Sequence, residues 1–256
     1  EAREAWTRSG GRQVVKTFLP VHELGGAIPS RADARAALGV NAANVALFFG
    51  HIRPFKGLDL ALRAWRELKT DVLLIAAGEA WWEKAAEYEQ LSRELGLPVI
   101  LSRPERSEGT VEGPPAENNG MVTSWGSFGR PSAAQDDRAV RFDFRFIPDS
   151  EIATFFAAAD VVLAPYRIEA QSGVALTAFH FARPVIATTV GGLPEIIDGS
   201  NGILIPPEDP SALANAVDEF FTARDRAAME RAAAASARRY SWPEYAAVFA
   251  ALVDGR

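Results

Sequence analysis

The sequence predicts an α/β fold, a Rossmann-like doubly wound parallel sheet, and three observations support this prediction. From Val45 onward, short apolar runs alternate with longer stretches of helical periodicity, as in stacked βα units. The short runs are apolar throughout, which is typical of parallel strands covered on both faces. The chain has 256 residues, of which 48% are hydrophobic and 23% charged, so it can bury a large core.

The strands and helices follow in chain order. The apolar runs predict strands at residues 45–50, 72–78, 98–101, 161–165, 184–188 and 202–205, with patterning renewed at 140. Helical periodicity predicts helices at 58–68 and 82–95, and a helical stretch precedes each of the last three strands. Asp209 before Pro210 indicates a helix start, because Asp caps well and Pro suits the first helical position. Ser241 and Glu244 fit a capping box, so the last helix is expected to begin at Trp242.

Three parts are predicted. Residues 1–40 are a linker or entry segment with turn signals and one helical patch near 31–38. Residues 41–240 form the Rossmann-like domain, and residues 241–256 form the C-terminal helix. Within the domain, residues 102–138 are predicted to be a long, flexible, disordered insertion, because 14 of these 37 residues are Gly, Pro or Ser.

Composition excludes several classes of function. The net charge of −6 argues against a general nucleic-acid binder. The absence of Cys excludes disulfides and thiolate chemistry, and three His residues are too few for a convincing all-His metal site. No uncharged apolar run reaches the ~18 residues of a membrane span. The chain is therefore expected to be soluble and cytoplasmic, and, because it begins with Glu1 instead of Met, part of a longer protein.

The turn after the first strand, residues 50–57 (GHIRPFKG), is the first candidate ligand loop. It places two cations and two glycines where an open α/β sheet binds its ligand. Arg53 can grip phosphate oxygens through its fork, and Lys56 can act as a point charge. The alternative is that both are solvated loop charges. The loop matches neither GxGxxG nor GxxxxGK[ST], since Lys56 precedes its glycine.

A second candidate loop, residues 166–173 (YRIEAQSG), follows the strand that ends at Pro165. Ser172 and Gly173 are small enough for a ligand to approach backbone N–H groups at a helix start, where the dipole favours phosphate. A carboxylate repels phosphate, so Glu169 is predicted to face another part of the ligand, such as sugar hydroxyls. The alternative is a helix-entry carboxylate that stabilises the dipole.

Two further features predict no chemistry on their own. The turn at residues 188–195 (TTVGGLPE) again joins a strand to a helix through glycines, which indicates a tight βα turn. His180 lies in an apolar helical stretch and is interpreted as a core or groove-lining residue, because lone histidines on apolar faces usually are.

Taken in order, the three loops resemble the carboxyl-terminal, donor-binding domain of retaining glycosyltransferases of the two-domain B architecture, of the group 1 or family 4 type. The resemblance spans residues 45–221 apart from the insertion. Its most specific part is Glu169, the segment Ala-Arg-Pro-Val-Ile-Ala at 182–187 and Gly-Gly-Leu-Pro-Glu at 191–195. It implies that the fold is the C-terminal half of a two-domain glycosyltransferase.

The resemblance also implies a set of site residues. In the family a nucleotide-sugar diphosphate lies against a lysine that matches Lys56 and against N–H groups that match residues 171–173, while a Glu that matches Glu169 binds sugar hydroxyls. Two positions depart from the pattern: the ribose-binding Glu falls at Thr177, and the first-loop Arg falls at His51, with Arg53 as its substitute. The implied catalytic residues are Glu169, Lys56 and Arg53, and the implied donor-binding residues are Gly50, His51, Gln171, Ser172, Gly173 and Thr177.

The family places its acceptor site on an amino-terminal domain, which this chain lacks. The implied partners are the nucleotide-sugar donor and that missing domain. Any contact with a membrane would be peripheral and would be made by the missing domain. Residues 1–40 would be the interdomain linker, and the last helix would resemble the terminal helix that crosses back toward the missing domain. No metal or other cofactor is expected, because Lys, Arg and helix dipoles offset the charge of the leaving diphosphate.

The predicted function is therefore hexose transfer from a nucleoside-diphosphate sugar to an unspecified acceptor, in the manner of enzymes that build cell-envelope polysaccharides. The chain alone is expected to be inactive. Two alternatives stay open. One is a non-catalytic or degenerate nucleotide-sugar-binding fragment, and the other is half of a nucleotide-sugar epimerase.

Overall fold

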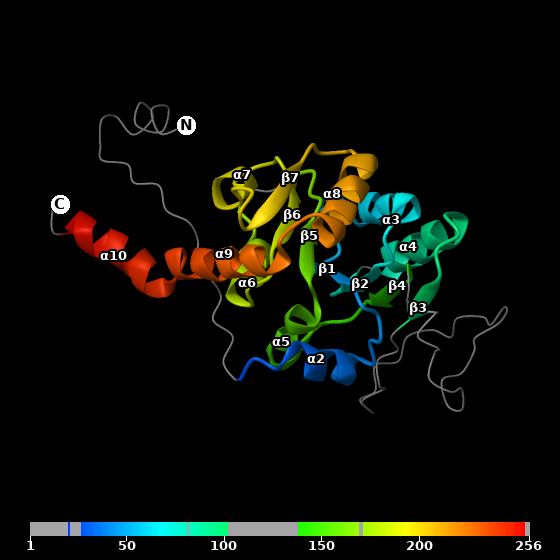
Figure 1. The fold of residues 1–256 in the computed structure, drawn as a ribbon, viewed down its shortest axis with the longest axis horizontal. Helices are drawn as coiled ribbons and strands as arrows, with labels where there is room; N and C mark the ends of the chain where they lie inside the picture. Colours follow the sequence, from blue (N-terminus) through cyan, green and yellow to red (C-terminus); the bar gives the residue numbers. More distant parts are fainter. Residues whose placement is uncertain (1–19, 21–26, 81, 102–137, 169–170, 254–256) are drawn as a thin grey trace.

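In the described part of the chain, seven strands form one wholly parallel sheet in the order β3-β4-β2-β1-β5-β6-β7 (Figure 1). The computed structural model describes residues 20, 27–80, 82–101, 138–168 and 171–253. The strands are β1 (Val45–Phe49), β2 (Leu73–Ala77), β3 (Val99–Leu101), β4 (Val140–Asp143), β5 (Val161–Ala164), β6 (Val185–Thr188) and β7 (Gly202–Ile205). Every predicted strand is present, and the predicted fold class is confirmed.

Helices cover both faces of this sheet, as expected of a doubly wound fold. Successive side chains of β1 point to opposite faces: Leu47 packs with α5 and α6, and Phe48 packs with α3 and α8. The helices and the short 3-10 turn are α2 (Arg31–Leu38), η1 (Pro54–Lys56), α3 (Leu58–Glu67), α4 (Trp82–Glu94), α5 (Asp149–Ala158), α6 (Gly173–His180), α7 (Leu193–Ile196), α8 (Pro210–Thr222), α9 (Arg226–Arg239) and α10 (Trp242–Val253).

The helix starts follow the capping signals in the sequence. The carboxylate of Asp209 accepts a hydrogen bond from the backbone N–H of Ala212 at 2.8 Å, and Pro210 occupies the first helical position of α8. Helix α10 begins at Trp242, where the capping box predicts it. Helix α9, which was not predicted from the sequence, is capped in the same way by Asp225.

An ion-pair cluster lies at the amino ends of β1 and β5. Asp160, which is 3% exposed, accepts hydrogen bonds from Val45 N at 2.8 Å and from Arg35 Nη2 at 2.7 Å. Arg35 also donates from Nε to the carbonyl of Ala158 at 2.9 Å. These contacts hold α2, the end of the predicted entry segment, against α5. The candidate site lies at the opposite edge of the sheet, where the strands have their carboxyl ends.

The predicted insertion at residues 102–138 and the C-terminal helix α10 are two additions to the sheet and its covering helices. The predicted insertion lies outside the described residues except for Arg138, and the strands on either side of it, β3 and β4, pair in parallel. Helix α10 continues from α9 away from the sheet, and its Trp242 and Phe249 are 53% and 47% exposed (Figure 1). None of the helices in the described parts of the chain is both long and apolar enough to cross a membrane.

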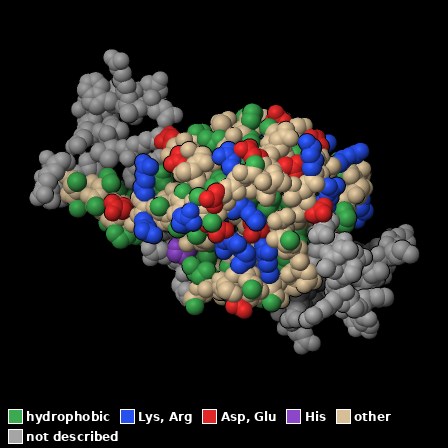
Figure 2. Space-filling model, in the orientation of Figure 1, with side chains coloured by type: hydrophobic (Ala, Val, Ile, Leu, Met, Phe, Trp, Pro, Cys, Tyr) green, Lys and Arg blue, Asp and Glu red, His purple; other side chains and the backbone are tan. Residues whose placement is uncertain are grey.

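The surface carries charges of both signs. On the face shown in Figure 2, basic and acidic side chains are interspersed, and hydrophobic side chains are visible along α10.

Candidate functional site

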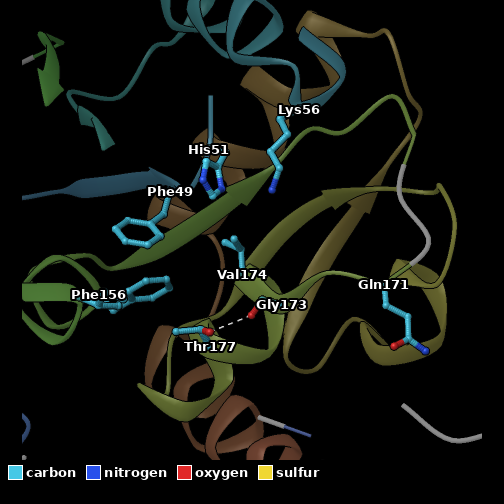
Figure 3. A pocket seen from close by; sticks show the side chains of 10 residues that line it. Phe49, His51, Lys56, Phe156, Gln171, Gly173, Val174 and Thr177 are labelled. Carbon is cyan, nitrogen blue, oxygen red and sulfur yellow. Dashed lines mark hydrogen bonds between the residues drawn. The ribbon is translucent and has the colours of Figure 1, made fainter. Parts of the chain in front are cut away.

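A cavity of about 330 Å³ opens at the carboxyl edge of the sheet. The strand order reverses at β1, which pairs with β2 on one side and β5 on the other, and ligands of open α/β sheets bind at this kind of switch point. The first loop, helix α5 and the start of α6 line the cavity (Figure 3). Six of the predicted site residues line it: Gly50, His51, Lys56, Gln171, Gly173 and Thr177.

The other predicted site residues have different positions. Ser172 is buried and caps α6, where its hydroxyl oxygen accepts a hydrogen bond from Ala175 N at 3.2 Å. Arg53 precedes η1 in extended conformation and is not among the residues that line the cavity. Glu169 lies outside the described residues, so its role stays a prediction.

The first loop carries Lys56 to the mouth of the cavity. The Nζ atom of Lys56 lies 4.8 Å from the centroid of the buried Tyr166 ring, a cation–π contact. Gly50 has φ +98°, and a Cβ there would lie 3.4 Å from Val174 and 3.9 Å from the Lys56 Nζ. The amino group of Lys56 points toward Val174 and the first turn of α6 (Figure 3). The cation and the helix start therefore share one side of the cavity.

The first turn of α6 is open to a ligand. The first N–H groups of a helix have no hydrogen-bond partner within the helix. In α6, the N–H of Ala175 donates to the hydroxyl oxygen of Ser172. A Cβ built on Gly173 would meet nothing within 4 Å, so there is room above this turn. The positive end of the α6 dipole thus faces the cavity beside Lys56, an arrangement that favours an anion.

The opposite wall is mainly apolar. The rings of Phe49 and Phe156 meet edge to face with centroids 4.9 Å apart, and Ile152 lies beside them along α5. Thr177 donates its hydroxyl proton to the carbonyl of Gly173 at 2.8 Å (Figure 3). Its oxygen can therefore only accept a further hydrogen bond from a ligand hydroxyl.

His51 stands at the exposed rim. Its Nε2 lies 3.6 Å from a carboxylate oxygen of Glu79, and the two side chains are 65% and 57% exposed. An ion pair this exposed contributes little to stability. His51 is therefore placed to meet a ligand at the entrance rather than in the interior.

Arg167 lies in the second candidate loop, but no individual role was predicted for it, and it holds the wall of the cavity without lining it. Its guanidinium forms a two-pronged ion pair with Asp59 at 2.8 and 2.9 Å, donates to the carbonyl of Pro54 at 2.7 Å and pairs with Glu208 at 2.5 Å. Burial opposes the charged form of Asp59, but the hydrogen bonds and charge of Arg167 outweigh it and lower the pKa of Asp59. The hydrogen bonds that Arg167 donates to Asp59 in turn raise the pKa of Arg167. No sequence motif signals these contacts, which join distant segments.

The third loop and His180 have supporting positions. The hydroxyl of the buried Thr188 donates to the carbonyl of Tyr166 at 2.6 Å, which ties the third loop to the second. Gly191 has φ +54° in the tight turn before α7. His180 is half-buried in the last turn of α6, with its ring 5.0 Å from that of Phe181, a packing position as predicted. Within the described ranges, His, Asp and Glu side chains form no group of three that could hold a metal ion.

Comparison of the sequence with known proteins gives one family and a set of bacterial relatives. The profile of the family "Glycosyl transferases group 1" matches residues 125–223. The D-inositol 3-phosphate glycosyltransferase of Saccharomonospora viridis is 31% identical over 242 residues, covering 89% of this chain and 47% of the relative. The protein of the same name from Mycolicibacterium gilvum is 31% identical over 216 residues, or 83% of this chain and 40% of the relative. The chain thus spans less than half the length of these two relatives.

Solved structures share the fold. HepE of Anabaena, in complex with UDP, superposes with a TM-score of 0.68 at 20% identity and covers 100% of this chain and 62% of that one. The C-terminal domain of the group 1 glycosyl transferase LpcC from Francisella tularensis superposes with a TM-score of 0.61 at 19% identity, over 88% of this chain and 96% of that domain. The second match shows that the chain shares the fold of that C-terminal domain.

Proposed function

The chain belongs to the group 1 glycosyltransferases and corresponds to their carboxyl-terminal domain, and from this premise we propose that its cavity binds the nucleoside-diphosphate part of a sugar donor. One observation carries the proposal. Lys56 and the start of α6 face the same cavity at the switch point of the sheet, so a fixed cation and a helix dipole converge where a diphosphate would lie. The HepE structures in complex with UDP and with UDP-glucose support this choice of ligand.

The proposed reaction is transfer of a hexose with retention of configuration. When the bond between the anomeric carbon and the diphosphate oxygen breaks, negative charge develops on the diphosphate. Lys56 and the N–H groups near Ser172 would stabilise that charge without a metal ion, and Arg53, outside the cavity lining, would do so only if the first loop turned it toward the ligand. Glu169 would bind sugar hydroxyls, and Thr177 would accept a hydrogen bond from the ribose. His51 and Gln171 would contact the donor at the rim.

The acceptor would bind to a second domain, in keeping with relatives of which this chain spans less than half the length. A polypeptide of these 256 residues is therefore expected to bind UDP without transferring sugar, and transfer by it alone would contradict the proposal. The Thr at position 177, where the family has Glu, favours one alternative, a binding module without transferase activity. Sugar transfer by the full-length protein would exclude that alternative.

Isothermal titration calorimetry with UDP tests the proposal directly. Lys56→Ala should weaken UDP binding by roughly 1–3 kcal/mol, the usual scale of a charge-assisted contact, with little change in melting temperature. Lys84→Ala is the matched control, because Lys84 is a partly exposed lysine on α4 that pairs with Glu87 away from the cavity. Unchanged UDP affinity in Lys56→Ala would show that the first loop is a solvated turn with no part in UDP binding.

A further inference from the structure

We propose that Arg167 is a positioning residue that holds the first loop, and with it Lys56, against the strand end of β5. The inference rests on the proposed function, because it concerns the same donor cavity. Arg167 itself does not line the cavity, whereas Lys56 does. Its effect on a ligand would therefore be exerted through the loop.

Contacts with residues 165–167 hold the backbone on both sides of Lys56. The N–H of Arg167 donates to the carbonyl of Phe55 at 2.7 Å, and the Nη1 of Arg167 donates to the carbonyl of Pro54, also at 2.7 Å. On the other side, Gly57 lies so near β5 that a Cβ there would come within 2.1 Å of the carbonyl oxygen of Pro165. The backbone from 54 to 57 is thus fixed against residues 165–167, and Lys56 is within this fixed stretch.

The charge of Arg167 is satisfied inside the protein. Asp59 on α3 accepts from both of its Nη atoms, and Glu208, after β7, accepts from its Nε. Together with the bond to Pro54, these contacts use four of the five N–H donors of the guanidinium. Two carboxylates offset its single charge. Arg167 is therefore engaged in joining three segments and is poorly suited to bind phosphate itself.

The fork geometry explains why an arginine is needed here. Lys has a single ammonium on a flexible stem and cannot hold Asp59 with two parallel bonds while also reaching Pro54 and Glu208. Arg167→Lys should therefore keep the charge but release the loop. If Arg167 mattered only through its charge, this variant would behave like the unmodified protein.

A double-mutant cycle on UDP binding tests the coupling. The 256-residue chain and its variants Arg167→Ala, Lys56→Ala and the double variant would be titrated with UDP and with uridine. We expect Arg167→Ala to weaken UDP binding about tenfold in the native background and less than about twofold in the Lys56→Ala background. Binding of uridine, which has no phosphate for Lys56 to meet, should change by less than about twofold in Arg167→Ala.

The control is Arg35→Ala. Arg35 makes a similar set of contacts, to Asp160 and to backbone carbonyls, at the opposite edge of the sheet. Its loss should lower stability and leave UDP affinity unchanged. If Arg167→Ala does not fold, Arg167→Lys takes its place in the cycle, with the same expected loss of UDP affinity.

The outcomes separate the two proposals. Equal weakening by the Arg167 variant in both backgrounds, or equal loss of UDP and uridine binding, would show a general structural role and overturn this inference alone. UDP affinity in Arg167→Lys equal to that of the native chain would also overturn it. A native chain that binds no UDP would overturn the proposed function, and this inference with it.

Discussion

Replacing Gly57 by Ala should damage both the fold and the site, for a reason that can be worked out from the structure. Gly57 has φ +75°, in the left-handed region, which costs an L-residue about 1–2 kcal/mol. In addition, the new Cβ would lie 2.1 Å from the carbonyl oxygen of Pro165, shorter than the 3.4 Å of ordinary contact by about 1.3 Å. Because the obstacle is backbone, the loop itself must move.

Gly39→Ala provides the matched comparison. Gly39 has φ +62° at the end of α2, and a Cβ there would meet nothing within 4 Å. Its replacement should cost only the conformational part, about 1–2 kcal/mol. Gly57→Ala should add an overpacking cost of about 1–3 kcal/mol, for a total of about 2–5 kcal/mol.

Urea unfolding of both variants would measure this difference, and UDP titration would measure its effect on the site. Gly57→Ala should weaken UDP binding because the moved loop displaces Lys56, whereas Gly39→Ala should not. Equal losses of unfolding free energy in the two variants would refute the steric argument. Unchanged UDP affinity in a destabilised Gly57→Ala would refute the link between loop position and binding.

Three further predictions use the same assays. Glu169→Gln should weaken UDP-glucose binding and spare UDP, whereas Thr177→Glu should tighten both about fivefold, equivalent to about 1 kcal/mol; equal weakening of both ligands by Glu169→Gln would remove its sugar role. Parallel β3 and β4 need a crossover of about a dozen residues. Replacing residues 102–137 by a flexible linker of that length should therefore change the unfolding free energy by less than about 1 kcal/mol, whereas joining the two strands directly should lower it by more. Because the pKa of Asp59 is held below its ordinary value of 3.8, its contribution to stability is present above that value and lost as pH falls through the lowered pKa; Asp59→Asn should flatten this part of the pH–stability curve, measured by urea unfolding.

The sheet could be predicted from the sequence because its strands are buried on both faces. A run such as residues 72–78 is apolar at every position, so it needs no periodicity to be recognised. Helix α9 is the opposite case. Among its residues only Met229 and Ala233 are buried, so its apolar stripe is too narrow to give a clear helical period.

The site was predictable as far as it depends on position along the chain. Lys56 and Gly173 belong to the loops that follow β1 and β5, and the strand ends of a parallel sheet meet at one edge, so their convergence follows from the fold. The contacts of Arg167 do not follow in this way. Its partners Asp59 and Pro54 lie 108 and 113 positions earlier, and no local pattern encodes a pairing at that distance.

The same long separations bear on how the protein is made. During synthesis, a nascent chain that ends before β5 holds the first loop but neither Arg167 nor α6, and so it lacks one side of the cavity. Glu208, a further 41 positions along, closes the set of contacts. Because these non-local contacts need residues from most of the domain, a nucleotide that binds as proposed can meet the complete site only when most of the domain has left the ribosome. Such a ligand would stabilise the finished domain but would not guide its early folding.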